Sequence, residues 1–188
     1  CDPGLFTKSG TIELSLTDAP IDAENVSGVY ITINEIQYNQ SGTGGEEEGS
    51  WVTMEEFEGP KEYNLLELTD GTSELLGTLE LPAGQYNQIR FMLDVPEMGQ
   101  QATNPGCYLE YEDGTQEALF VPSGGQSGYK ATGAFQVPEN GTVELTADFD
   151  VRKAVVSAGA SGKFILKPTI RLVANNEAGK INGSVTGY

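Results

Sequence analysis

Short runs of alternating apolar and polar residues recur along most of the chain. In the run TIELSLT, the apolar residues Ile12, Leu14 and Leu16 alternate with polar ones, and successive side chains of a β-strand point to opposite faces of a sheet. No segment carries a sustained apolar period of about 3.6 residues, which an amphipathic helix requires. The pattern therefore predicts a chain built from β-strands.

The second run changes the parity of its apolar residues part-way along. The stretch Val29–Ile33 has them at odd positions, whereas Ile36 and Tyr38 fall at even positions. One extra residue in a strand shifts the parity in this way. We therefore expect a β-bulge or a break near Asn34.

Further runs of β-forming residues continue to the end of the chain, and turn-forming residues separate them. These strands are expected at Trp51–Met54, Glu62–Leu68, Gly77–Leu81, Tyr86–Asp94, Cys107–Glu112, Gln116–Val121, Tyr129–Gln136, Thr142–Phe149 and Lys163–Val173. The last of them contains Pro168, which has no N–H for a ladder hydrogen bond, so this run is expected to lie at an edge or to break there.

The spacing of strands and turns indicates the fold class. Asp113-Gly114 lies between two β-rich runs and is typical of a two-residue type I′ hairpin. Short helical turns are expected at Thr72–Leu76 and Asp150–Val156. Short strands with a turn about every 8–12 residues favour an all-β, antiparallel Greek-key β-sandwich.

Composition limits the size and the partners of the domain. The 188 residues suffice for one domain with a proper core, and no apolar run reaches the roughly 18 residues of a membrane-spanning helix. The net charge is −18, and four of the ten basic residues precede residue 151. An acidic surface repels phosphate backbones, so no nucleic-acid partner is expected. We interpret the excess of acid as solubilising.

The residue types exclude several kinds of catalysis. The chain has no histidine and two cysteines, which leaves no Ser-His-Asp arrangement and too few ligands for a tetrahedral zinc site. A glycoside hydrolase needs only two carboxylates about 5–10 Å apart across a cleft, but among 28 acids some pair meets that distance by chance. We expect a non-catalytic domain.

Two groups of carboxylates are candidates for a calcium site. Asp18, Asp22 and Glu24 fall in one loop, and Asp148 and Asp150 flank Phe149. Carboxylates at such spacing can converge on calcium, which takes six to eight oxygen ligands, although no EF-hand pattern is present. Asp-Ala-Pro is also ordinary turn chemistry, and Asp150 is a candidate N-cap. We favour the structural interpretation and expect no cofactor, with calcium as the alternative.

Three further residues are candidates for ligand contact. Trp51, with Tyr30, Tyr38 and Tyr86, could form a platform on which a sugar stacks. Aromatic residues of strands more often belong to the core, and we favour the core for these four. Ser123 and Ser127 lie in a glycine-rich loop that lacks the Lys-[Ser/Thr] ending of a phosphate-binding loop.

Several segments together resemble a known family. They are Gly10–Pro20, Val29–Ile33, Trp51–Thr53, Leu65–Leu68, Leu81–Tyr86, Ile89–Arg90, Val121–Gly124, Asp148–Lys153 and Leu166–Leu172. In this order, over residues 10–175, they are similar to the bacterial lipoprotein domain described as domain of unknown function 4382. The resemblance implies an exported β-sandwich domain, often tethered to a membrane through an N-terminal lipidated cysteine, and it brings no catalytic residue. The segment Lys180–Tyr188 looks like the opening strand of a carboxypeptidase-regulatory, transthyretin-like module.

Cys1 is the expected lipidation site. A cysteine followed by Asp-Pro-Gly is what remains after a lipoprotein signal peptide is cleaved, and acyl chains on it would anchor the protein in a membrane. The alternatives are an arbitrary start of the chain and a disulfide with Cys107. We favour lipidation and expect Cys107 to be a small buried apolar residue.

These observations give a domain plan and a function to test. Residues 1–9 are expected to be a tether, residues 10–176 the β-sandwich, and residues 177–188 an extra strand or the start of a following module. The expected role is that of a lipoprotein domain in the bacterial cell envelope, facing the periplasm or the exterior, which binds an unknown protein or glycan, mediates adhesion or supports the envelope. The alternatives are a calcium- or carbohydrate-binding module and, third, a carboxylate-based glycoside hydrolase.

Overall fold

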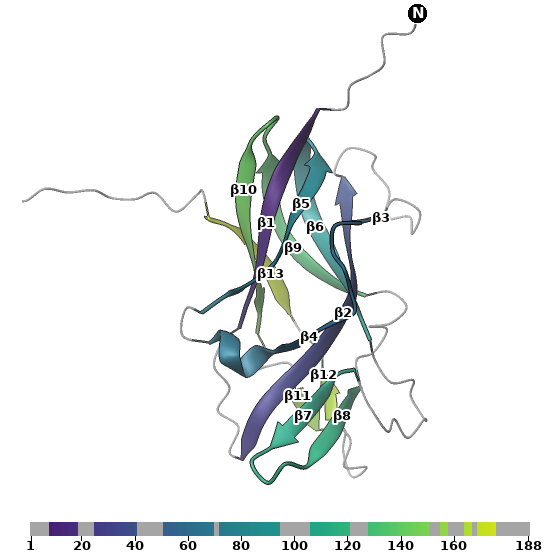
Figure 1. Cartoon of the computed structure of the whole chain (residues 1–188), viewed down its shortest axis with the longest axis vertical. Helices are drawn as coiled ribbons and strands as arrows, with labels where there is room; N and C mark the ends of the chain where they lie inside the picture. Colours follow the sequence, from purple (N-terminus) through teal and green to yellow (C-terminus); the bar gives the residue numbers. More distant parts are fainter. Residues whose placement is uncertain are drawn as a thin grey trace, which may run out of the picture.

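The structure is a computed structural model, and it describes residues 8–18, 25–40, 51–69, 72–94, 106–120, 128–150, 155–157, 164–166 and 169–175. This part of the chain is almost entirely β-strand, with one short 3-10 helix, η1 (Figure 1). The elements are β1 (Ser9–Asp18), β2 (Val26–Gln40), β3 (Trp51–Thr53), β4 (Lys61–Asn64), η1 (Leu65–Leu68), β5 (Glu74–Pro82), β6 (Gly84–Leu93), β7 (Tyr108–Tyr111), β8 (Gln116–Phe120), β9 (Tyr129–Val137), β10 (Thr142–Phe149), β11 (Val155–Ser157), β12 (Phe164–Leu166) and β13 (Ile170–Ala174).

The hydrogen bonds connect the 13 strands in one curled, mixed sheet (Figure 1). Its order is β11-β12-β8-β7-β2-β6-β9-β13-β10-β1-β5, with β3 and β4 also paired to β2. The all-β class is confirmed. The expectation of a purely antiparallel arrangement is wrong, because β1–β10, β9–β13 and β8–β12 are parallel pairs.

A parallel pair arises where a strand from a distant part of the chain lies between two strands that are consecutive in the sequence. The strands β9 and β10 are consecutive, yet β13 lies between them, antiparallel to β10 and parallel to β9. On its other side β10 pairs with β1. All these strands are connected in one hydrogen-bonded sheet, so the two-sheet Greek-key sandwich that the spacing of turns suggested is not confirmed.

The longest strand, β2, connects the two parts of the sheet. Its first half pairs with β4 and β7, and its second half pairs with β3 and β6. Its register against β6 shifts between Ile33 and Glu35, which confirms the predicted bulge at Asn34. The extra residue lets both Ile33 and Ile36 point into the core, where each is completely buried.

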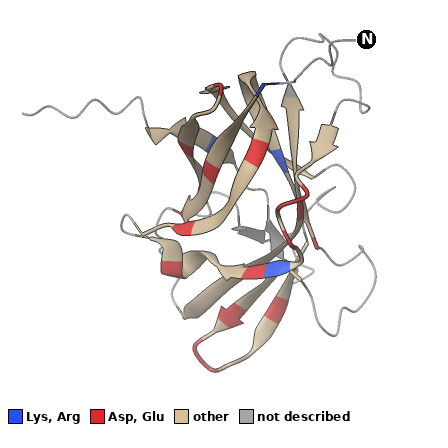
Figure 2. Cartoon of the chain, turned by 45° about the horizontal axis from the view of Figure 1, so that its top comes forward, with Lys and Arg blue, Asp and Glu red and all other residues tan. Residues whose placement is uncertain are grey.

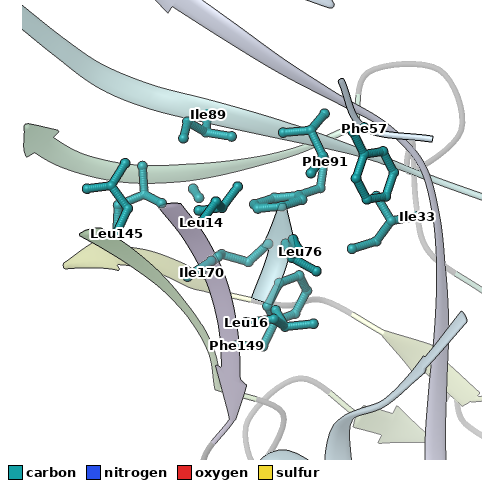
Figure 3. Close-up of a cluster of buried hydrophobic side chains, with 14 of the residues drawn as sticks. Leu14, Leu16, Ile33, Phe57, Leu76, Ile89, Phe91, Leu145, Phe149 and Ile170 are labelled. Atoms are coloured by element: carbon teal, nitrogen blue, oxygen red, sulfur yellow. The ribbon is translucent and has the colours of Figure 1, made fainter. Parts of the chain in front are cut away.

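The core fills the concave side of the curled sheet (Figure 3). Leu14, Leu16, Leu145 and the rings of Phe91 and Phe149 meet there, and the two rings pack edge to face with centroids 5.8 Å apart. Burial of such a side chain contributes about 1.5–3 kcal/mol. The alternation read from β1 therefore identified a true inner face.

Both predicted helical turns are corrected in the described residues. Glu74 already belongs to β5, where it pairs with Leu16, and Val155 belongs to β11. The one short helix instead replaces the end of a predicted strand at Leu65–Leu68. There the Asn64 side chain accepts a hydrogen bond from the Leu66 N–H, at 3.2 Å, as an N-cap does.

The hairpin predicted at Asp113-Gly114 joins β7 to β8, but its turn type differs. Of the pair only Gly114 has a positive φ, 83°, and its N–H donates to the Tyr111 carbonyl. This is a type I turn followed by a left-handed glycine. The Asp113 carboxylate accepts hydrogen bonds from the Thr115 side chain and N–H, which lower the pKa of Asp113.

The last predicted strand is broken. The strand β12 ends at Leu166 and pairs with β8, whereas β13 begins at Ile170 and pairs with β9 and β10. The break predicted around Pro168 is confirmed, and Pro168 itself lies outside the described residues.

Tyr86 connects β6 to the end of β5 through a side-chain hydrogen bond. Its ring is completely buried, stacks on Phe135 with centroids 5.3 Å apart, and meets the edge of Tyr38. Its hydroxyl donates to the Pro82 carbonyl at 2.6 Å. This arrangement resembles the tyrosine corner of immunoglobulin-like sandwiches, in which a tyrosine near the start of a strand bonds back to the backbone.

We expect Tyr86→Phe to lower the free energy of unfolding by about 1–3 kcal/mol, because the Pro82 carbonyl loses its buried donor. Denaturant unfolding measures the change. Tyr111→Phe is the control, because its hydroxyl bonds Glu117 in a partly exposed hairpin and its loss is expected to cost less. Equal losses in the two variants would contradict this account of the corner.

The Tyr86→Phe variant is also expected to change how the stability of the protein depends on pH above about pH 10. Burial raises the pKa of Tyr86 to about 12, whereas a tyrosine in an unfolded chain titrates near pH 10. The native state keeps a proton that the unfolded state releases, so this contribution to stability is complete below about pH 10 and is lost as the pH rises towards 12. The fall in stability over that range is expected to be shallower in Tyr86→Phe than in the wild type.

Candidate ligand-binding surface

Trp51 lies partly exposed at the start of β3, with two cations against its ring. The guanidinium carbon of Arg90 lies 4.5 Å from the ring centroid, and the ammonium nitrogen of Lys130 lies 5.8 Å from it. Both distances are within the range of a cation–π interaction. These three residues, with Gln37 and Thr53, form what we name the Trp51 surface.

The sheet register brings these side chains together. Thr53 pairs with Gln37, Gln37 with Arg90, and Arg90 with Lys130, in one row across β3, β2, β6 and β9. Cross-strand partners have Cβ atoms about 4.5–5.5 Å apart on the same face of a sheet. The neighbouring residues Ile89 and Ala131 are buried, so this row lies on the outer face.

Hydrogen bonds fix the guanidinium over the indole. The Nε atom of Arg90 donates to Gln37 Oε1 at 2.9 Å, and an Nη atom donates to the same oxygen. Gln37 Nε2 donates in turn to Glu35 Oε2 and to Thr53 Oγ1, each at 3.2 Å. A side chain held on two sides loses little freedom when a ligand binds.

The charged groups at this surface are of both signs. Glu35 is the acid in the hydrogen-bond network, against the two cations Arg90 and Lys130. Lys130 is exposed and makes no ion pair with any residue that the structure describes. The arrangement offers an aromatic ring, an exposed ammonium group and a hydroxyl group on the outer face of the sheet.

Comparison with known proteins identifies the family. Residues 9–168 match the family model described as Domain of unknown function (DUF4382). The chain belongs to this family. No curated protein and no solved structure matches it. The matched segment stops before β13, the strand that lies between β9 and β10 and completes this part of the sheet.

One finding concerns membranes. Within the residues described, no helix is both long enough and apolar enough to cross a bilayer.

The structure divides the aromatic residues that the sequence grouped together. Tyr86 is core, as expected, whereas Trp51 is not part of the core cluster and lies on the outer face. The parity of β3 gives no clear signal for this, because Val52, which points to the other side, is 48% exposed. Ser123 and Ser127 lie outside the described residues.

The candidate metal ligands do not share one face. Asp18 pairs with Phe149 on the inner side and is 5% exposed, whereas Asp148 pairs with Thr17 on the outer side and forms an ion pair with Arg171 at 3.3 Å.

Asp150 follows the end of β10, where its N–H donates to the Thr169 carbonyl. No three His, Cys, Asp or Glu residues gather as a metal site in the described part of the chain. Asp22 and Glu24 lie outside it.

Cys107 is a buried thiol, as the sequence predicted. It is completely buried and free, and its Sγ donates to the Asp94 carbonyl at 3.3 Å. Burial raises the pKa of Cys107 to about 12, so the reactive thiolate is scarce at neutral pH. Cys1 lies outside the described residues.

We expect calcium to leave the stability of the protein unchanged, because Asp148 is neutralised by Arg171 and Asp18 faces the opposite side of the sheet. Thermal unfolding in millimolar calcium and in excess chelator should give coincident curves. A site filled a hundredfold over its Kd would contribute about 2.7 kcal/mol, which for a chain of this length is a shift of about 5–10 °C. A rise of that size in the unfolding temperature would show that calcium binds the folded protein and would contradict this prediction.

Proposed function

We propose that this chain is a non-catalytic binding domain of a bacterial cell-envelope lipoprotein, tethered to a membrane through a lipidated Cys1, and that it binds a glycan with the Trp51 surface. The observation that carries the proposal is the partly exposed indole of Trp51, with the cations of Arg90 and Lys130 over its ring on the outer face of the sheet.

The arrangement of groups suits a saccharide. A sugar presents a patch of C–H groups that packs on an aromatic ring, while its hydroxyls need a few placed polar partners. At the Trp51 surface the exposed ammonium of Lys130 and the hydroxyl of Thr53 lie in the same row as Arg90, whereas the amide of Gln37 is already hydrogen-bonded to other side chains. Tryptophan and arginine are also the residues that most often dominate binding energy at interfaces.

The non-catalytic part of the proposal rests on chemistry that the chain lacks. With no histidine, the usual general base and the usual partner of a nucleophilic serine or cysteine are missing. A carboxylate-based hydrolase remains the competing function, and it would require a deep cleft holding a carboxyl group of raised pKa.

The proposed location in the cell envelope is supported by the resemblance to bacterial lipoprotein domains, with Cys1 as the proposed lipidation site. We expect mass spectrometry of the N-terminal peptide, from protein expressed from its native gene and extracted from membranes, to show an acylated cysteine. In Cys1→Ser the protein should move to the soluble fraction. An unmodified N-terminus would remove the tether from the proposal.

The binding surface can be tested directly, because Trp51 is the one tryptophan of the chain. We expect at least one of dextran, mannan, xylan, dextran sulfate and polygalacturonate to change its fluorescence saturably. Trp51→Ala should weaken that binding about two- to tenfold by calorimetry, as loss of an aromatic contact predicts.

Val52→Ala is the matched control, since Val52 is the next residue on β3, is 48% exposed and points to the other side. It should leave binding unchanged. If none of the five polysaccharides binds by calorimetry, the glycan-binding role is wrong.

A further inference from the structure

We propose that the glycan recognised by the Trp51 surface is anionic, with carboxylate, sulfate or phosphate groups along the chain, and that Lys130 and Arg90 bind its charge. This inference rests on the proposed function and specifies its ligand class.

The first argument is the rarity of positive charge in this part of the protein. The chain carries −18 in total, and only Lys8, Lys61, Arg90 and Lys130 are basic before residue 151. Carboxylates lie on many strands, and cations are few (Figure 2). Two of these four cations nevertheless meet at a single tryptophan.

The second argument is the register of the two cations. Arg90 and Lys130 are direct cross-strand partners on β6 and β9, and like charges directly opposite each other destabilise a sheet. Opposite charges face each other in the neighbouring pair of strands, β13 and β10, where Arg171 lies opposite Asp148 and forms an ion pair with it. The Trp51 ring offsets part of the repulsion, and a bound anion would lower it further.

The third argument is that the positive charge is available locally. Lys130 is exposed and makes no ion pair within the described part of the chain. At physiological ionic strength charges act over about 8 Å, so the distant carboxylates do not cancel the attraction at the Trp51 surface. The net charge of the chain slows the approach of every polyanion, so the affinity of this ligand depends on its contacts at the Trp51 surface.

The chemistry expected of the ligand follows from these groups. An acidic polysaccharide presents a pyranose ring for Trp51 and, beside it, a charged group for the ammonium of Lys130. A neutral polysaccharide would use the ring and the polar groups only. The two classes therefore differ in how their binding responds to salt and to the charge at position 130.

The experiment follows the fluorescence of Trp51 with three polymers, namely polygalacturonate, dextran sulfate and uncharged dextran. We expect one or both anionic polymers to bind and dextran to bind at least tenfold more weakly. Binding should weaken at least tenfold between 50 and 500 mM NaCl, because neutralised charges release counterions as the complex forms. Polygalacturonate and dextran sulfate then distinguish carboxylate from sulfate recognition.

The variants separate a local effect from the effect of net charge. Lys130→Glu should weaken binding of the anionic polymer at least tenfold, and Lys130→Gln should weaken it by less. Lys61→Glu is the matched control, because Lys61 also lies over an aromatic ring, that of Phe57 at 5.3 Å, and the substitution changes the net charge by the same amount. It should change affinity less than twofold.

The outcomes distinguish the two proposals. If dextran binds as tightly as the anionic polymers and salt has no effect, the anionic ligand class is overturned while glycan binding stands. If Lys61→Glu weakens binding as much as Lys130→Glu, the charge effect is global and the assignment to Lys130 is overturned. If neither anionic polymer binds, the anionic ligand class is overturned, and glycan binding itself fails only if none of the five polysaccharides binds.

Discussion

The parallel ladder between β1 and β10 is the constraint on which the rest of the sheet depends. It joins Thr11–Asp18 to Thr142–Phe149 over eight residue pairs, so two segments from nearly opposite ends of the chain must meet. A hairpin cannot form a parallel pair, and the intervening loop costs conformational entropy when it closes. The buried faces of the two strands offset that cost, with Ile12 beside Val143 and Leu14 beside Leu145 in the core.

The same strand register fixes the positions of the side chains that form the Trp51 surface. From β10 the sheet continues through β13 and β9 to β6, β2 and β3 without a break in hydrogen bonding. Alternation along each strand then sends one set of side chains into the core and the other to the outer face. Because Ile89 and Ala131 are buried on the inner face, the next residues, Arg90 and Lys130, both point to the outer face. A site on the strands of a rigid sheet needs no loop to order itself when a ligand arrives.

The sequence allowed the faces of the strands to be predicted, but not their partners. Periodicity gave the inner side of β1 and the bulge at Asn34, because both are properties of one strand. It could not give the parallel pairing of β10 with β1, which depends on long-range closure. The helix at Leu65–Leu68 was missed because its cap, Asn64, looks like any polar residue at the end of a strand. Trp51 was assigned to the core because its position on an edge strand is visible only once β3 is paired.

The alternation of strand faces also explains why the carboxylates Asp18 and Asp148 lie apart, whereas the residues of the Trp51 surface lie together. Continuing the alternation of β1 by two residues beyond Leu16 would have placed Asp18 on the inner face, away from Asp148, so parity already argued against one shared metal site. No pattern within a strand brings Arg90 opposite Lys130, because that pairing joins two strands separated by the hairpin of β7 and β8. The opposed cations weaken the sheet locally, and the core does not require either of them. Two like charges facing each other on an outer face, where any polar pair would satisfy the fold, are expected where a ligand brings a charge of the opposite sign.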